Sequence, residues 1–308
     1  MDLDLNLLRT FLLILDHGSV TAAAEELRLT QPTVSHSLRR LRRAVGDPLF
    51  VRQGSRLSPT ARALELEPVV RASLGALDDA LDADTRFDPA TTTRRFHIAL
   101  SDVGEQLFLG RIVGALTAQA PESRLTAVPM DIDDVTDWLR RGEVDAAIAT
   151  VPIDVSGRTT IVDDDRYVAI LPQDWGPQSR PLTIEELRSR PQAVITREAG
   201  HDLLARALDG LGLDTDAMVR VRHFSVMPQL VRDAGLIGFV PAYMAAYMTL
   251  DQPAEWGVRV AELPRTTPHF DVTLYWNEGM TGSVGPRRWF VELVRHALAG
   301  STVPGPFS

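Results

Sequence analysis

The stretch from Thr21 to Val45, TAAAEELRLTQPTVSHSLRRLRRAV, constrains this chain most, because it has the pattern of two helices joined by a tight turn. Four aliphatic residues of the second helix recur at spacings of four, three and four, which places them along one buried stripe. They are Val34, Leu38, Leu41 and Val45. The opposite face has no acid and no large apolar side chain, and it carries Pro32, His36, Arg39 and Arg43, flanked by Thr33, Ser35 and Arg40.

This outward face suits a helix that enters the DNA major groove. Arginine can bond both acceptors of guanine, hydroxyls and Gln can reach base edges or phosphates, and a Thr methyl can touch the thymine methyl. Thr30 can cap the helix, and Pro32 lies in its first turn, where no intrahelical N–H is needed. The pattern predicts a helix-turn-helix over Ala23 to Arg42. The alternative is an ordinary helical hairpin with a solvated arginine face.

The segments on either side extend this prediction. Residues 5–15 are an apolar helix, and Gly46-Asp47-Pro48 ends the basic helix. Residues 49–52 and 55–58 then form two short strands around Gln53-Gly54, with an arginine on each arm. Residues 1–58 are therefore expected to be a winged helix-turn-helix domain. Its expected DNA contacts are Thr30, Gln31, Pro32, Thr33, Ser35, His36, Arg39, Arg40, Arg43, Arg52 and Arg56.

The charge is unevenly distributed along the chain. The formal net charge is −9, yet residues 1–60 hold eight Arg and six acids, a balance of +2, which leaves −11 for the remainder. The field at the contact surface decides DNA binding, so an acidic body with a basic helix and wing still binds DNA. The small local charge indicates that one copy binds weakly and that dimerisation supplies the rest.

Residues 59–89 form the next segment, a long helix followed by a polar hinge at residues 82–93. Apolar residues recur at spacings of three and four, and Pro68 inside the helix is expected to kink it or break its first turn. The seam either packs on its own domain or pairs with a second subunit. Its members are Ala63, Leu66, Val70, Leu74, Leu77 and Leu81.

From Arg94 onward, short apolar strands alternate with helical patterns in two successive sets. This alternation predicts an α/β domain with largely parallel sheets in two lobes. Strands are expected at residues 96–100, 125–128, 145–149, 167–171, 193–196, 218–222, 236–240 and 270–276. Helices are expected at residues 103–119, 133–141, 183–189, 202–211, 226–234, 242–249 and 286–299.

The first fifty residues resemble LysR-type transcriptional regulators, on the N-terminal position, the QPTVS run and the GDPLFVR wing. Arg42 and the Ser58–Ala61 stretch depart from the usual family pattern. SPTARALEL, SDVGE and HF are similar to the branch that answers to aromatic acids (salicylate, nitroaromatics) and flavonoids.

The resemblance implies how the whole chain is organised. It implies a fold like periplasmic solute-binding proteins, with the chain crossing between lobes near residues 163–166 and 265–269. The effector domain is then 90–308, with lobe 1 about 90–164 and 268–308 and lobe 2 about 165–267. It also implies a homodimer or homotetramer on a pseudo-palindromic double-stranded operator, and RNA polymerase as a partner if the protein is an activator.

Ligands of open α/β sheets bind beyond the carboxyl ends of strands, so polar residues at strand ends indicate the site. Hydroxyls and imidazoles there suit a carboxylate, aromatic side chains suit a ring, and Asp102 is expected to cap a helix. A small aromatic carboxylate is therefore the expected effector, with no other cofactor. The candidate residues are Ser101, Asp102, Thr150, His201, His223, Phe224 and Tyr275.

Two other functions remain open at this point. A hydrolase using Ser101 and His223 is disfavoured, because Ser101 lacks the Gly-x-Ser-x-Gly turn and the chain has no phosphate loop or metal-ligand spacing. A constitutive DNA-binding protein would need no two-lobed body. With no cysteine, no membrane-length apolar run and acids at the N-terminus, the chain is expected to be cytoplasmic. Because it lacks these catalytic motifs, it is expected not to be an enzyme.

Overall fold

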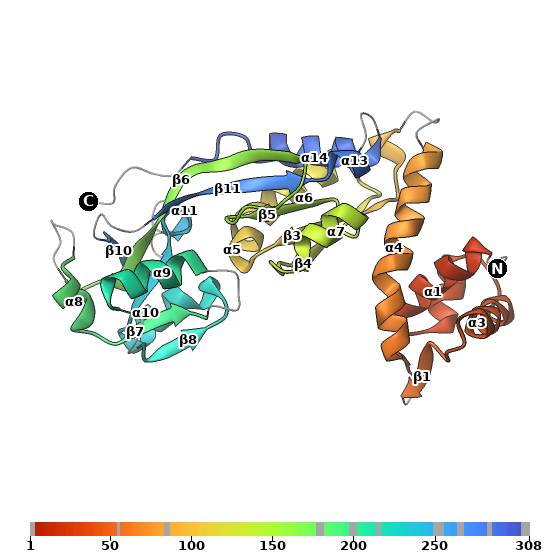
Figure 1. Ribbon diagram of the computed structural model, residues 1–308, viewed down its shortest axis with the longest axis horizontal. Coiled ribbons are helices and arrows are strands. Elements are labelled where there is room, and N and C mark those ends of the chain that lie inside the picture. Colours follow the sequence, from red (N-terminus) through yellow and green to blue (C-terminus); the bar gives the residue numbers. More distant parts are fainter. Residues whose placement is uncertain are drawn as a thin grey trace. The chain divides into compact units, whose positions relative to one another are not determined.

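The computed structural model describes residues 4–53, 56–82, 87–176, 182–196, 202–213, 217–248, 256–263, 268–281 and 285–302. The chain divides into two compact units (Figure 1). The N-terminal unit comprises Met1–Arg86 with Arg141–Glu143, and the C-terminal unit comprises Phe87–Arg140 with Val144–Ser308.

Three helices, α1 (Leu5–His17), α2 (Val20–Glu26) and α3 (Gln31–Val45), form the core of the N-terminal unit. Gly18 and Gly46 end α1 and α3 in the left-handed conformation, with φ of 63° and 74°. This conformation costs glycine little, because it has no Cβ. The aliphatic stripe of α3 lies inward as expected, with Val34, Leu38 and Leu41 buried beside Phe11 and Ile14 of α1.

The expected side-chain cap on α3 is wrong. Thr30 does occupy the N-cap position, but its side chain makes no capping bond. Its hydroxyl oxygen instead lies 2.8 Å from that of Thr33, so the two hydroxyls satisfy each other at the helix start.

A two-stranded wing follows α3. Strands β1 (Phe50–Gln53) and β2 (Arg56–Pro59) pair antiparallel, and residues 54–55 between them lie outside the described part of the chain. Arg42 donates to the backbone carbonyls of Pro48, at 2.5 Å, and Phe50, at 3.0 Å. The residue that departs from the family pattern therefore fastens the wing to α3.

Helix α4 (Ala61–Asp82) runs unbroken through Pro68, so of the two expected effects, a kink or a break, the break does not occur. Its seam is divided. Val70 and Leu74 are only 7% and 6% exposed, because they pack into the core of the same unit, whereas Leu77 is 40% exposed. Leu74 is therefore not free to face a second subunit, which corrects that part of the prediction; the side chain of Leu81 lies outside the described residues.

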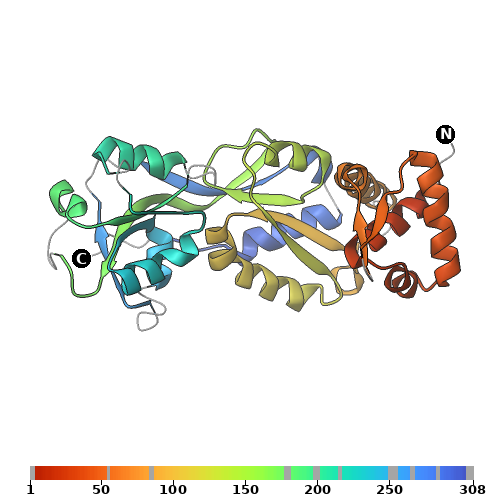
Figure 2. The same ribbon diagram turned by 90° about the horizontal axis from the view of Figure 1, so that it is seen from below.

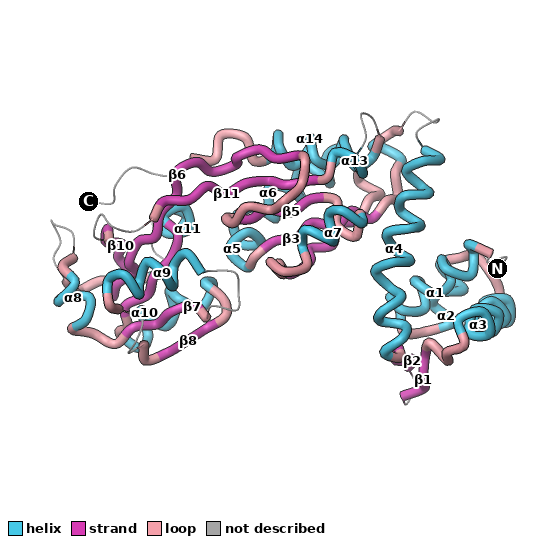
Figure 3. Tube along the Cα trace, in the orientation of Figure 1, coloured by secondary structure: helices cyan, strands magenta, loops and turns pink. Residues whose placement is uncertain are grey.

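The C-terminal unit is organised on a nine-stranded sheet in the order β4-β3-β5-β11-β6-β9-β7-β8, with β10 pairing with β6 (Figure 3, strands in magenta). Strands β3, β4 and β5 pair parallel in the first lobe, and β7, β8 and β9 pair parallel in the second. The strands span β3 (Arg95–Leu100), β4 (Arg124–Pro129), β5 (Ala146–Ala149), β6 (Gly157–Pro172), β7 (Gln192–Ile195), β8 (Val219–Val221), β9 (Ile237–Pro241), β10 (Val258–Glu262) and β11 (His269–Trp276).

Two long antiparallel strands correct the expectation of largely parallel sheets. β11 runs antiparallel to both β5 and β6, and β6 continues from the first lobe into the second without a break. The first half of β6 pairs with β11, and its second half lies between β9 and β10. The strand at residues 157–162 and strand β10 were not expected from the sequence. Figure 2 shows the same unit from below, with β6 in green and β11 in blue.

The crossing between the lobes lies within these two strands. The pairing of β11 with β6 shifts register twice, once between Phe270 and Val272 and once between Val272 and Thr273. Asp164 there has a φ of 54°, a conformation rare for a residue with a Cβ. His269 Nδ1 lies 2.7 Å from Asp164 Oδ1, and residues 264–267 lie outside the described chain.

The helices of this unit mostly coincide with those expected. The first of them, over residues 102–119, is interrupted by a π-helical turn, a rare feature often found at functional sites. The helical segments are η1 (Pro89–Thr91), α5 (Asp102–Gly104), the π-turn η2 (Glu105–Leu109), α6 (Gly110–Gln119), α7 (Val135–Arg141), α8 (Ile184–Arg188), α9 (Asp202–Leu211), η4 (Phe224–Val226), α10 (Met227–Ala234), α11 (Ala242–Ala246), α13 (Glu278–Thr281) and α14 (Pro286–Ala297).

One buried cluster extends through both lobes, and a smaller one packs on the other face of the first lobe's sheet around α7. Within the described residues, every helix is too short or too polar to cross a membrane.

Candidate DNA-binding face and ligand cavity

The exposed face of α3 carries most of the residues predicted to contact DNA. Gln31, Pro32, Thr33, His36 and Arg39 are exposed, as are Thr30, Arg40 and Arg43, and Ser35 is half-buried. Gln31 Nε2 lies 3.5 Å from Ser35 Oγ, which joins two polar groups on successive turns. The face is therefore a continuous polar and basic surface, the arrangement that a groove-reading helix requires.

The wing supplies a second basic position. Arg52 is exposed on β1, and the side chain of Arg56 lies outside the described residues. Arg40 is the exception on the helix, because its Nη1 lies 3.4 Å from Asp4 Oδ2, an ion pair that DNA phosphates would have to compete with.

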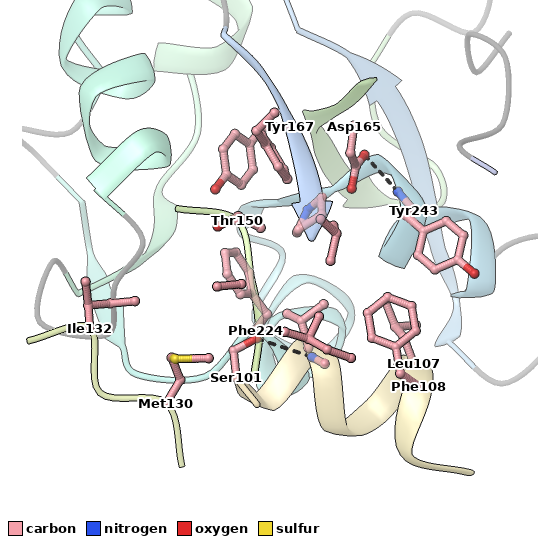
Figure 4. A pocket seen from close by; sticks show the side chains of 17 residues that line it. Ser101, Leu107, Phe108, Met130, Ile132, Thr150, Asp165, Tyr167, Phe224 and Tyr243 are labelled. Atoms are coloured by element: carbon pink, nitrogen blue, oxygen red, sulfur yellow. Dashed lines mark hydrogen bonds between the residues drawn. The ribbon is translucent and has the colours of Figure 1, made fainter. Parts of the chain in front are cut away.

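The C-terminal unit encloses an inner cavity at the crossing between its lobes (Figure 4). Its volume of about 50 Å³ is several times the roughly 10–15 Å³ that one water needs, and about a third of the roughly 150 Å³ of an engineered cavity that binds benzene. Its walls are mainly apolar and aromatic, and the polar groups among them are few. Lining side chains include Ser101, Leu107, Phe108, Met130, Ile132, Thr150, Asp165, Tyr167, Phe224 and Tyr243, together with Phe270 and Val272.

Seven separate segments of the described chain line this cavity. Ser101 follows β3, and Thr150 follows β5, at the carboxyl ends of parallel strands as the sequence predicted. The π-turn places Leu107 and Phe108 consecutively on the wall, and Phe108 stacks on Tyr243 with ring centroids 5.8 Å apart. Tyr167 and Phe270 from the two long strands meet at 4.8 Å and close the opposite side.

An outer cleft adjoins the inner cavity, and Ser101 and Met130 line both. The outer cleft is more polar, and it includes Arg222 and His223 of the second lobe together with the acids Asp102 and Glu105 of the first. Ser101 caps α5, accepting from the Gly104 N–H at 3.3 Å, which leaves its O–H hydrogen able to reach a ligand at the junction of the two spaces.

Asp102 forms a bond between the lobes. Its Oδ2 accepts from the backbone N–H of Ser225 at 3.1 Å. Asp102 was expected to cap the helix, but Ser101 occupies that position and Asp102 reaches across to the second lobe instead.

The structure brings most of the other predicted effector residues together. Phe224 is buried against the inner cavity, and His223 is exposed on the outer cleft. Ser101 Oγ accepts from the Gly104 N–H, and among the described residues no hydrogen bond joins it to His223. His201 lies outside the described residues.

Tyr275 does not line either space, which corrects the sequence prediction. It is only 6% exposed and packs in the smaller cluster with Leu139 and Val144. The reason is strand direction: β11 runs antiparallel to β5, so the carboxyl end of β11 lies at the opposite end of the sheet from Ser101 and Thr150. The start of β11, with Phe270 and Val272, reaches the cavity instead.

Asp165 lines the inner cavity but was not among the candidates that the sequence suggested. It lies on β6 at the crossing, is 1% exposed, and lines the inner cavity. Burial raises its pKa to about 6 from an ordinary 3.8, although backbone N–H groups and the charge of Arg166 oppose the shift. Burial, with help from the Asp165 charge, also raises the pKa of Tyr167. The only sequence signal was the acidic run at 163–165 between two apolar segments.

Comparisons with known proteins agree with this architecture. Residues 5–64 match the bacterial regulatory helix-turn-helix protein, lysR family, and residues 89–299 match the LysR substrate binding domain. The chain is 30% identical to the HTH-type transcriptional activator NagR of Ralstonia sp over 96% of this chain and 99% of NagR. It is 32% identical to the HTH-type transcriptional activator NahR of Pseudomonas putida over 90% of this chain and 91% of NahR.

A solved structure of a probable transcriptional regulator from Pseudomonas aeruginosa is also similar, with a TM-score of 0.73 and 27% identity. It covers 96% of this chain and 97% of that one. These matches confirm the resemblance that the N-terminal motifs indicated. The chain belongs to the LysR family of bacterial helix-turn-helix regulators, with an N-terminal DNA-binding domain and a C-terminal effector-binding domain.

Proposed function

We propose that this regulator is switched by a small aromatic carboxylate bound at the crossing between the lobes. The ring enters the inner cavity between Phe108, Phe224 and Phe270, whose side chains move apart to admit it, and the carboxylate points toward the outer cleft. The observation that carries this proposal is the position of Ser101, whose hydroxyl borders both the apolar cavity and the polar cleft with Arg222 and His223.

We further propose that the exposed face of α3 and the wing contact DNA, and that the protein acts as an activator with RNA polymerase. Its relatives NagR and NahR are both named transcriptional activators, which supports this direction. A ligand that touches both lobes favours one closure angle by its differential affinity, and the crossing at Asp164 can absorb the rotation.

The proposed assembly is a dimer, or a tetramer as a dimer of dimers, on a pseudo-palindromic site. Exposed apolar side chains on α4, chiefly Leu64, Val69 and Leu77, provide surface for a second copy. Two DNA-binding domains held together would bind DNA more tightly than one, which compensates for the small positive charge of a single domain.

A thermal-shift panel of aromatic acids tests the effector class. A ligand at 100 times its dissociation constant adds about 2.7 kcal/mol to the free energy of unfolding. We expect Ser101→Ala to weaken the binding of a stabilising acid several-fold in isothermal titration, because one hydrogen bond to the carboxylate is lost.

Thr117→Ala is the matched control, since this hydroxyl on α6 bonds only the Val113 carbonyl at 2.8 Å among its described contacts. Equal affinity in the Ser101→Ala protein and wild type would place the carboxylate elsewhere. Absence of stabilisation by every acid would favour the constitutive DNA-binding alternative.

A further inference from the structure

Asp165 introduces an acid into a cavity whose other polar lining groups are hydroxyls. In Figure 4 it lies at the far side of the lining side chains from Ser101, close to Tyr243. It is 1% exposed, and the described lining of the inner cavity contains no basic side chain. The two ends of the cavity therefore differ: the end near Ser101 adjoins a cleft that holds both bases (Arg222, His223) and acids (Asp102, Glu105), and the end near Asp165 holds a buried acid with no basic side chain in the described lining.

The backbone holds this carboxylate in place. Its Oδ1 accepts from the N–H of Arg166 at 2.8 Å and from the N–H of Tyr243 at 3.2 Å, which ties β6 to the start of α11. The guanidinium of Arg166 forms two bonds to Glu262 of β10, at 3.0 and 2.6 Å. Asp165 is thus fixed at the crossing, and the neighbouring guanidinium is directed toward another acid.

An ionised carboxylate only accepts hydrogen bonds. A hydroxyl or amino group on a bound ring would meet it with a charge-assisted bond, which is about twice as strong as a neutral one. A second carboxylate at the same position would face a like charge in a space with little water, where repulsion is poorly screened.

Resting on the proposed function, we propose that Asp165 is the specificity-determining residue of the inner cavity. It selects aromatic acids that carry a hydrogen-bond donor, a hydroxyl or an amino group, on the side of the ring opposite the carboxylate. It rejects aromatic acids that carry a second carboxylate there. The ligand is then held at both ends, by Ser101 at its carboxylate and by Asp165 at its donor.

Asp165→Asn inverts the polarity of this end. The carboxylate accepts from the Arg166 and Tyr243 N–H groups on Oδ1 and also from the Ala242 N–H, and we expect the amide oxygen to take the Oδ1 position, where it keeps two of these bonds. The amide nitrogen then takes the place of Oδ2 and supplies donors where the wild type has an acceptor. Asp163→Asn is the matched control, since it removes the same charge two residues away on β6, from an exposed side chain.

Isothermal titration of the full chain at pH 8 compares four probes: benzoate, 4-hydroxybenzoate, 4-methoxybenzoate and terephthalate. We expect wild type and Asp163→Asn to bind 4-hydroxybenzoate about tenfold or more tighter than benzoate. 4-Methoxybenzoate lacks the donor and gains nothing, and terephthalate binds weakest. In the Asp165→Asn protein, we expect the preference for 4-hydroxybenzoate over benzoate to fall to a few-fold or less. Terephthalate then binds more tightly than 4-hydroxybenzoate.

Equal binding of benzoate and 4-hydroxybenzoate by wild type would overturn the role of Asp165 and leave the effector class intact. The same shift in the Asp163→Asn protein would show a general charge effect and would equally overturn it. No binding of any benzoate would overturn the proposed function together with this inference. The wild-type comparison of hydroxyl and methoxy probes decides the question even if Asp165→Asn does not fold.

Discussion

The DNA-binding face and the ligand cavity assemble their chemistry in different ways. The first is one side of a single helix, with a short wing beside it, over residues 30–56. The second draws on segments as distant in the chain as Ser101 and Phe270, which meet only because two long strands cross between the lobes. A surface made by one helix depends on local periodicity, whereas a cavity made by several strands depends on their directions.

This difference determined how much could be predicted. The inward stripe of α3 and its exposed basic face follow from a helical period of 3.6 residues, and both agree with the structure. Ser101 and Thr150 were also found, because the rule for carboxyl ends of parallel strands applies to β3 and β5. Tyr275 was misplaced because the same rule was applied to a strand of opposite direction.

Asp165 and the divided seam of α4 could not be predicted for a related reason. An acid between two apolar segments is typical of an exposed turn, and nothing local shows that β6 continues through it. Likewise, Leu74 and Leu77 share a helical stripe on α4. The N-terminal core extends far enough along α4 to cover Leu74 and leaves Leu77 exposed, and the sequence does not show where that core ends.

The largest expected effect is in α4. Leu74→Asp buries a charge in the N-terminal core and should lower the free energy of unfolding by about 4 kcal/mol or more. Leu77→Asp should leave stability nearly unchanged and split the proposed dimer. Thermal unfolding and sedimentation separate the two, with the exposed Met218→Asp as control. A Leu77→Asp protein that sediments as wild type would remove α4 from the interface.

The next effect concerns Asp165 and pH. With a folded pKa near 6 against an ordinary 3.8, the folded protein retains a proton between these values that the unfolded chain has released. Stability therefore falls as pH rises through this window and stays lower above it, by about 3 kcal/mol in total. Asp165→Asn should be more stable than wild type at pH 8 and gain nothing at pH 4. Denaturant unfolding of both proteins at pH 4 and pH 8 measures this difference. If wild type and Asp165→Asn show the same pH dependence, burial does not raise the pKa of this carboxylate.

In the DNA-binding unit the expected effects are smaller and differ in kind. Arg39→Ala should cost about 1–3 kcal/mol on the operator and relax specificity at one position. Arg52→Ala should weaken all sequences alike and lower the salt slope by about one unit. Binding titrations at several salt concentrations distinguish these, with Arg62→Ala on α4 as a control for charge alone. If both variants bind operator DNA with the affinity of wild type, the DNA-binding face lies elsewhere on the domain.

The smallest effect tests whether the bond between Asp102 and the Ser225 N–H holds the lobes in the observed closure. Asp102 affects binding of an aromatic acid in two opposing ways. Its bond to the Ser225 N–H supports the observed closure, whereas its charge, which lines the outer cleft, repels a carboxylate. Asp102→Asn removes the charge and keeps an acceptor oxygen, so the acid should bind as tightly as in wild type or more tightly.

Asp102→Ala removes both the charge and the acceptor. Relative to Asp102→Asn it should bind the acid about fivefold more weakly, the equivalent of one exposed hydrogen bond of about 1 kcal/mol. Salt provides the internal check. The gain of Asp102→Asn over wild type should disappear at high ionic strength, because exposed charges are screened. The difference between the Asn and Ala proteins should persist, because it comes from a bond in only one of the two closure states. If that difference also disappears with salt, Asp102 acts on the ligand through its charge and the lobes are held by other contacts.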